Sequence, residues 1–148
     1  MKKSVKVSNN PYKTGKVPRG GEKADALNEE YFRWRCKSVD LDGNWGVRDV
    51  DCETLWGEVI PRLHSFESMR WNEIIGPRST SDHTMPVSAL ETPARDRLKE
   101  LGLEHLENLF QLSIKGKPRI WGYKDRIEFN LLWFDPDHTV YIVGKKGT

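Results

Sequence analysis

The chain has 148 residues, of which 36% are hydrophobic and 31% are charged. That length suits one domain, or one domain with a tail, and no apolar run is long enough to cross a membrane. Six Trp, five Phe and four Tyr exclude a wholly disordered chain, which could not bury them. No apolar stretch follows the N-terminal charges as in a secretory signal, so we expect a cytoplasmic protein.

The charge is unevenly distributed along the chain. Residues 1–23 hold seven Lys or Arg and one Glu, a net charge of +6, which leaves 17 basic and 21 acidic residues in 24–148, a net charge of −4. Asn, Pro and Gly clusters in the same region predict a flexible basic arm over 1–26. This arm is either a solubilising leader or a segment that attaches to phosphate backbones. We expect residues 27–148 to form a single α+β domain.

The first half of this domain predicts one strand followed by helices. Residues 31–39 alternate apolar and polar side chains, which is typical of a half-buried strand. Asp51 is suited to N-cap a helix that Pro61 should kink or divide. The apolar stripe of this helix recurs every four residues, at Leu55, Val59 and Leu63. A second helical piece is expected over 65–75, and a polar loop over 78–85.

The second half predicts one helix and a meander of strands. Thr92 is the expected N-cap, with Pro93 at the first helical position and Gly102 as a left-handed C-cap. A short helical turn is expected at 104–108. Strands are expected over 110–115, 119–123, 127–134 and 139–143. This order predicts an α+β fold in which helices pack on one face of a twisted antiparallel sheet with a C-terminal four-strand meander.

Such a sheet leaves its other face open for a ligand. Side-chain alternation assigns the apolar face of the longest strand to the core, with Ile127, Phe129, Leu131 and Trp133. Asn130 then lies on the open face, and on the neighbouring strand Arg119, Trp121 and Tyr123 share one side. An Arg flanked by aromatics suits single-stranded RNA, because the guanidinium pairs with phosphate and the rings stack on bases. The alternative is that both rings are half-buried core with Arg119 at the rim, since aromatic residues mostly serve packing.

Two histidines are candidate proton carriers. His138 follows an Asp-Pro-Asp turn whose Asp135 could orient it, and His83 lies in the polar loop. A ribonuclease that uses the 2′-hydroxyl needs a base, an acid and a cation, which His83, His138 and Arg119 would supply if the loop folded over the sheet. The alternatives are a plain turn in which Asp135 accepts a backbone N–H, and a zinc site that lacks any short-spaced ligand pair. We expect no metal and no cofactor.

The two cysteines, Cys36 and Cys52, lack C-x-x-C spacing. Without a secretory signal, free thiols are favoured over a disulfide.

The C-terminal half resembles a group of small, uncharacterised bacterial proteins. The resemblance is carried by Leu109-Phe-Gln-Leu-Ser-Ile-Lys-Gly-Lys-Pro-Arg-Ile-Trp-Gly-Tyr123 and Phe129-Asn-Leu-Leu-Trp-Phe-Asp-Pro-Asp-His138. In that group an Arg-aliphatic-aromatic-Gly strand precedes a Leu-Trp-x-Asp-Pro-x-His strand. The upstream segment 66–74 and His83 fit the same group, so the resemblance covers about residues 55–143.

More loosely, the element order resembles the RelE/ParE toxin superfamily. That resemblance implies a toxin that cuts mRNA at the ribosome with side chains of the open sheet face and is neutralised by a protein antitoxin. It points to Arg119, Tyr123 and His138. RelE-like toxins are usually shorter and more basic than this chain, and the Asp-Pro-Asp-His turn is not one of their signatures. The resemblance is therefore one of fold, which does not by itself imply function.

Two functional hypotheses follow. The leading one is a toxin-like RNA-binding protein, a metal-independent mRNA endoribonuclease of RelE-like type whose partners are RNA or the ribosome and an antitoxin. The alternative is a non-catalytic interaction module, a prophage or accessory protein that binds a protein partner. Neither hypothesis involves a membrane or a small-molecule cofactor.

Overall fold

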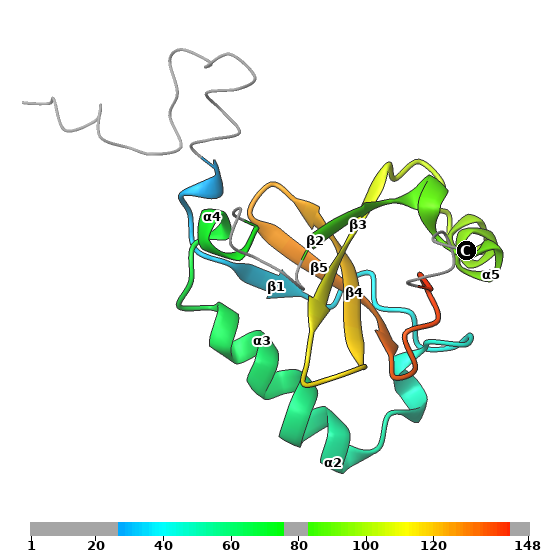
Figure 1. The fold of residues 1–148 in the computed structure, drawn as a ribbon, viewed down its shortest axis with the longest axis horizontal. Coiled ribbons are helices and arrows are strands. Elements are labelled where there is room, and N and C mark those ends of the chain that lie inside the picture. The colour runs from blue at the N-terminus through cyan, green and yellow to red at the C-terminus, as the bar shows by residue number, and fades with distance from the viewer. Residues whose placement is uncertain (1–26, 76–82, 143–148) are drawn as a thin grey trace, which may run out of the picture.

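Five strands form one mixed sheet in the computed structural model, which describes residues 27–75 and 83–142 (Figure 1). The strands are β1 (Arg33–Arg35), β2 (His83–Pro86), β3 (Asn108–Ser113), β4 (Arg119–Asp125) and β5 (Glu128–Asp135). Their order across the sheet is β1-β5-β4-β3-β2. Three of the four expected meander strands are present as β3, β4 and β5, and the sheet is mixed instead of antiparallel because β1 runs parallel to β5. The predicted arm over 1–26 lies outside the described residues.

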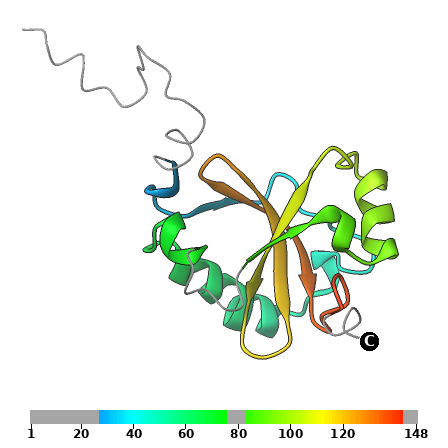
Figure 2. The ribbon, with the colours of Figure 1, turned by 45° about the horizontal axis from the view of Figure 1, so that its top comes forward.

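Helices cover both faces of this sheet. They are η2 (Val47–Asp49), α2 (Cys52–Thr54), the π-helical turn η3 (Leu55–Val59), α3 (Ile60–Phe66), α4 (Trp71–Ile74), η4 (Val87–Ala89) and α5 (Thr92–Glu100). Figures 1 and 2 show α3 and α5 on opposite sides of the strands. The α+β class is confirmed, but the expectation that all helices lie on one face is wrong. None of the helices in the described residues is long and apolar enough to cross a membrane.

The two faces carry separate apolar cores. The first core, under α3 and α4, consists of Phe32, Val59, Leu63, Phe66, Trp71, Ile74, Phe110, Leu112, Ile120, Phe129, Leu131 and Phe134. The second core, under α5, consists of Trp45, Met85, Leu90, Ala94, Leu98, Leu109, Trp121, Leu132, Trp133 and Val140. Adjacent residues of β3 and β4 enter opposite cores because strand side chains alternate. A sheet that is apolar on both faces needs helices on both.

A β-bulge in β5 directs its large side chains into both cores. Trp121 pairs with Trp133, but the next residue, Gly122, pairs with Leu131, so Leu132 is an extra residue on β5. One extra residue reverses the side-chain alternation beyond it. Phe129 therefore lies in the first core and Trp133 in the second, and the prediction that placed them on one face is wrong.

The helix boundaries follow the expected caps closely. The Asp51 carboxylate accepts the Thr54 N–H at 2.7 Å, which confirms it as the N-cap. Pro61 lies in the first turn of α3, directly after the π-helical turn, where its missing N–H costs little. The cap of α5 is Glu91 instead of Thr92, a shift of one residue. Gly102 has a φ of 75°, as expected for a left-handed C-cap.

Three segments differ from the sequence-based prediction. Residues 83–86, most of which were expected in the polar loop over 78–85, form the edge strand β2. This strand pairs with β3 and so covers the edge that β3 would otherwise expose. Among the described residues 139–142 there is no strand, because the Asp135 carboxylate binds the backbone N–H groups of Thr139 and Val140. The short helix expected over 104–108 is absent: residues 104–105 form a turn, and β3 begins at Asn108. Cys36 and Cys52 are free and exposed.

Candidate functional site

Trp121 was expected to stack on RNA bases, but it is fully buried beneath α5. Its ring lies in the second core, and its Nε1–H donates to Asp135 Oδ2 at 3.2 Å. Base stacking needs an aromatic face that is open to solvent. The expectation of an outward-facing Trp121 is therefore wrong, because α5 covers the face of the sheet on which Trp121 lies.

Tyr123 and Asn130 lie side by side on β4 and β5, as their register requires. Tyr123 is half-buried, and its hydroxyl shares a hydrogen bond of 2.6 Å with Ser38 Oγ. Asn130 is fully buried, and its Nδ2 donates to the Tyr123 carbonyl at 3.4 Å. The expectation that Asn130 faces solvent is wrong, so neither residue offers RNA a fully open surface.

Arg119 is half-buried beside the turn that joins β3 to β4. Its Nη1 donates to the carbonyl oxygens of Gly116, Lys117 and Pro118 at 2.6 to 3.0 Å. Three carbonyls of one turn thus share a single guanidinium nitrogen. This arrangement makes Arg119 a structural group of the turn and leaves fewer of its donors for a phosphate.

The expected pair of Asp135 and His138 does not form. Asp135 is fully buried, and its carboxylate accepts from Trp121 Nε1, the Thr139 N–H and hydroxyl, and the Val140 N–H. His138 instead donates from Nδ1 to the Tyr141 carbonyl at 2.8 Å, with a φ of 60°. The predicted orienting role of Asp135 is therefore wrong, and the plain-turn alternative describes this segment.

His83 begins β2, the edge strand that lies two strands away from β4. It pairs in register with Gln111 on the edge strand β2, and the order of the strands places β3 and β4 between β2 and β5. The structure therefore brings Trp121 to Asp135 and Tyr123 to Asn130. The strand order also separates the backbone position of His83, on β2, from that of His138, which follows β5.

A buried ion pair that the sequence did not reveal ties α5 to the loop after β1. Asp40 is 3% exposed, and its carboxylate accepts from Arg97 Nε and Nη2 at 2.9 and 2.8 Å. Trp133 Nε1 and the Asp42 N–H also donate to it, while Arg97 Nη1 binds Glu100. The Arg97 side chain is itself one-quarter exposed, whereas the Asp40 side chain is almost fully buried. Asp40 lies in an Asp-rich segment that the sequence pattern marks as a turn, and a turn of this kind does not predict that one of its carboxylates is buried.

Stability should fall in acid because of this pair. Burial alone raises the pKa of Asp40, but the hydrogen bonds from Arg97 and Trp133 and the guanidinium charge outweigh burial and hold that pKa below its ordinary value. The stabilisation is therefore complete above an unfolded-state pKa of about 3.9 and is lost as the pH falls through the lower, folded-state pKa. Urea midpoints at about pH 7, 5 and 3 should show a smaller acid loss in Asp40→Asn than in the wild type. Asp42→Asn, at an exposed carboxylate, should keep the wild-type loss; equal slopes in all three proteins would contradict this assignment.

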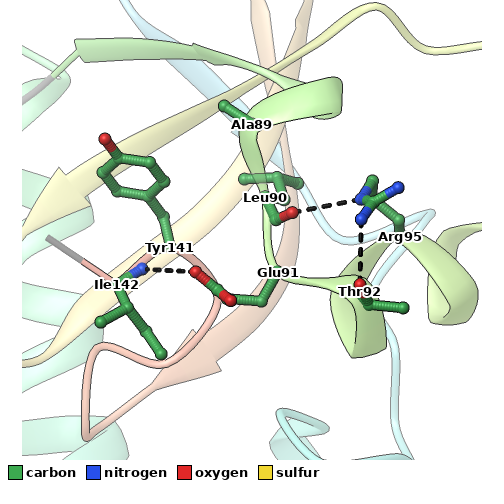
Figure 3. Close-up of a pocket in the computed structure, with 7 residues that line it drawn as sticks. All are labelled: Ala89, Leu90, Glu91, Thr92, Arg95, Tyr141 and Ile142. Atoms are coloured by element: carbon green, nitrogen blue, oxygen red, sulfur yellow. Dashed lines mark hydrogen bonds between the residues drawn. The ribbon is translucent and has the colours of Figure 1, made fainter. Parts of the chain in front are cut away.

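Three neighbouring hollows of about 390 Å³ each form a groove where the start of α5, the turn after β5 and the segment before α2 meet. The first is lined by Ala89, Leu90, Glu91, Thr92, Arg95, Tyr141 and Ile142 (Figure 3). The second is lined by Asn44, Trp45, Glu91, Pro93, Pro136, Asp137, Thr139 and Ile142. The third is lined by Asn44, Gly46, Asp49, Val50, Asp51, Thr54, Glu58, Pro118, Phe134 and Pro136. Because adjacent hollows share lining residues, we treat them as one surface, the acidic groove.

Carboxylates dominate the charge of the acidic groove. Its described lining residues include five acids, which are Asp49, Asp51, Glu58, Glu91 and Asp137, and one base, Arg95. Arg95 is held by its own helix start, since it donates to the Leu90 carbonyl at 3.1 Å and to Thr92 Oγ1 at 3.0 Å (Figure 3). The acidic balance of residues 24–148 was the only sequence signal that pointed toward such a surface.

The groove also has an apolar component and a fixed frame. Ile142 is 41% exposed, and its backbone N–H donates to Glu91 Oε2 at 3.2 Å, which ties the C-terminal segment to α5 (Figure 3). Trp45 is anchored by its Nε1 bond of 2.8 Å to Thr139 Oγ1. Carboxylates beside apolar side chains on a held backbone suit recognition of a cationic chain more than they suit bond-breaking chemistry.

Within residues 27–75 and 83–142, no group of three or more His, Cys, Asp or Glu is placed to hold a metal ion. Comparisons of this chain with protein-family models, with curated proteins and with solved structures found no match.

Proposed function

We propose that this chain is a non-catalytic interaction module that binds a basic, extended segment of a protein partner in the acidic groove. The observation that carries the proposal is the charge of the groove, whose described lining residues include five carboxylates and a single guanidinium, which is already hydrogen-bonded. Lys or Arg side chains of the partner would complement this net negative charge. Complementary charge of this kind steers association and selects the partner.

An extended occupant fits the shape of the groove. The three hollows follow one another, so side chains along an extended peptide would meet carboxylates and apolar residues in turn. Ile142 and the half-buried Val50 offer apolar contacts at the two ends. Apolar anchors within a charged rim are the usual arrangement of a protein interface.

The competing proposal is an mRNA endoribonuclease that acts at the ribosome and is neutralised by an antitoxin. It has less support, because Trp121 is buried and Arg119 Nη1 is bound to three carbonyls. A groove lined by carboxylates also repels phosphate, and phosphate contacts dominate the affinity of RNA-binding proteins.

A labelled peptide of about 12 residues with alternating Lys and Val tests the proposal by fluorescence anisotropy. We expect binding that weakens as salt rises from about 0.05 M to about 0.5 M. The double variant Asp49→Asn/Glu58→Gln should lose about fivefold in affinity, because it removes two of the groove charges. The matched control is Glu104→Gln/Glu107→Gln, which removes two exposed carboxylates outside the groove and should bind as the wild type does.

Three outcomes would overturn this proposal. The first is that the peptide does not bind. The second is that both double variants lose affinity equally, which would show attraction to overall charge alone. The third is that a single-stranded RNA is cleaved by the wild type but not by a folded Arg119→Ala variant, which would favour the endoribonuclease.

A further inference from the structure

A separate pocket of about 230 Å³ lies on the α4 side of the sheet, away from the acidic groove. It is lined by Ile75, Thr84, Asn108, Leu109, Phe110 and Lys124. Leu109 and Phe110 are buried apolar lining residues, while Thr84 and Asn108 are exposed and are its uncharged polar lining residues. Lys124 is the one ionisable group among these lining residues.

Lys124 is half-buried in an apolar setting. Its Nζ donates to the Arg126 carbonyl at 2.7 Å and lies 5.0 Å from the centroid of the Trp71 ring. When it is deprotonated, the amine can keep this bond through one N–H and still present its lone pair. Phe129 lies opposite Lys124 on β5, Trp71 of α4 faces its Nζ, and Asn108 of β3 lines the same pocket. None of these three residues is charged.

The lowered pKa of this amine favours its reactivity as a nucleophile. Burial lowers the pKa of the Lys124 ammonium below its ordinary value, and the Asp125 carboxylate, which acts in the opposite direction, does not restore it. A larger fraction of Lys124 is therefore neutral amine at pH 7 than in an ordinary lysine. A desolvated lysine in an apolar pocket is a recognised form of activated nucleophile.

We infer that this pocket takes small, uncharged carbonyl compounds and that Lys124 captures them as an imine. The Nζ lone pair adds to the carbonyl carbon while the carbon–oxygen π electrons move to oxygen, and a proton passes from nitrogen to that oxygen. Loss of the resulting hydroxyl with a second proton releases water and leaves a carbon–nitrogen double bond. Thr84 and Asn108 are the uncharged polar residues that line the same pocket as Lys124. No oxidant or reductant takes part in this capture.

The size and lining of the pocket define the class of ligand. About 230 Å³ admits a short or branched aliphatic aldehyde but not a polycyclic one. Apart from Lys124 itself, the lining residues carry no charge, so an uncharged ligand suits the pocket.

The probe is isobutyraldehyde with sodium cyanoborohydride, which reduces an imine to a stable secondary amine that peptide mass spectrometry locates. At pH 7 we expect Lys124 to be labelled at least about threefold faster than the exposed Lys99 and Lys115 of the same molecule. Pyrenecarboxaldehyde, which is too large for the pocket, should reverse that preference. Lys124→Arg should abolish labelling at this position without changing the rates at Lys99 and Lys115.

Thr84→Tyr provides a second test that leaves the amine in place. Thr84 is exposed on the edge strand β2, so a larger side chain can be accommodated while it fills the mouth of the pocket. Labelling of Lys124 should fall about fivefold, with Lys99 unchanged. Labelling of Lys124 that is no faster than that of Lys99, or that is unaffected by Thr84→Tyr in a folded protein, would overturn the inference.

Discussion

Replacement of Gly122 by alanine is expected to destabilise the fold by about 3 kcal/mol, because a side chain at this position has no space. A Cβ on Gly122 would lie 2.3 Å from the Asn130 carbonyl oxygen and 2.6 Å from Phe129 Cζ. The carbonyl belongs to the backbone of β5 at the bulge, so it cannot move without disturbing the pairing of Trp121 with Trp133. Urea denaturation at neutral pH measures this loss.

Gly57→Ala is the matched control for Gly122→Ala. Gly57 lies in the π-helical turn η3, and a Cβ there would have no neighbour within 4 Å. Alanine should therefore raise stability by about 0.5–1 kcal/mol, because glycine loses more conformational freedom in a helix. If both variants were equally stable, the close approach of β4 to β5 at the bulge would be wrong.

Loss of the buried ion pair should have a comparable effect. Arg97→Ala leaves the Asp40 carboxylate buried with only Trp133 Nε1 and the Asp42 N–H as donors. An unpaired buried charge costs about 3 kcal/mol, and the free energy of unfolding should fall by that amount. Chemical denaturation followed by tryptophan fluorescence provides the measurement.

The control for Arg97→Ala is Arg48→Ala. Arg48 pairs with Asp42 at 3.0 Å, but both side chains are more than half exposed. An exposed pair contributes less than about 1 kcal/mol, so this variant should remain close to the wild type. Similar losses in the two variants would mean that the Asp40 site is open to water in solution.

The ion pair also connects the fold to the proposed function. Asp40 precedes the segment that supplies Asn44 and Trp45 to the acidic groove, and Arg97 lies on α5, whose start supplies Glu91 and Arg95. The pair thus holds two walls of the groove in place. We expect Arg97→Ala to weaken peptide binding even under conditions where the variant remains folded.

Local patterns predicted those elements whose signals are local. The Asp51 cap, the left-handed Gly102 and the strands β3, β4 and β5 follow from capping chemistry and from side-chain alternation over a few residues. The α+β class followed from the order of these elements. The aromatic content and the net negative charge of residues 24–148 can likewise be read from the composition without any structure.

The tertiary structure decided which face each side chain occupies. The bulge at Leu132 depends on how β5 pairs with β4, and it places Trp133 beneath α5; Trp121 is buried because α5 docks on the face of β4 on which it lies. The same is true of Asp40, whose burial requires Arg97 from a helix 57 positions later in the chain. Strand pairing and helix docking are long-range contacts, and no window of local sequence contains both partners. For that reason the sequence determined the elements and their class, whereas only the folded chain determined that the RNA-stacking surface is closed and that the acidic groove exists.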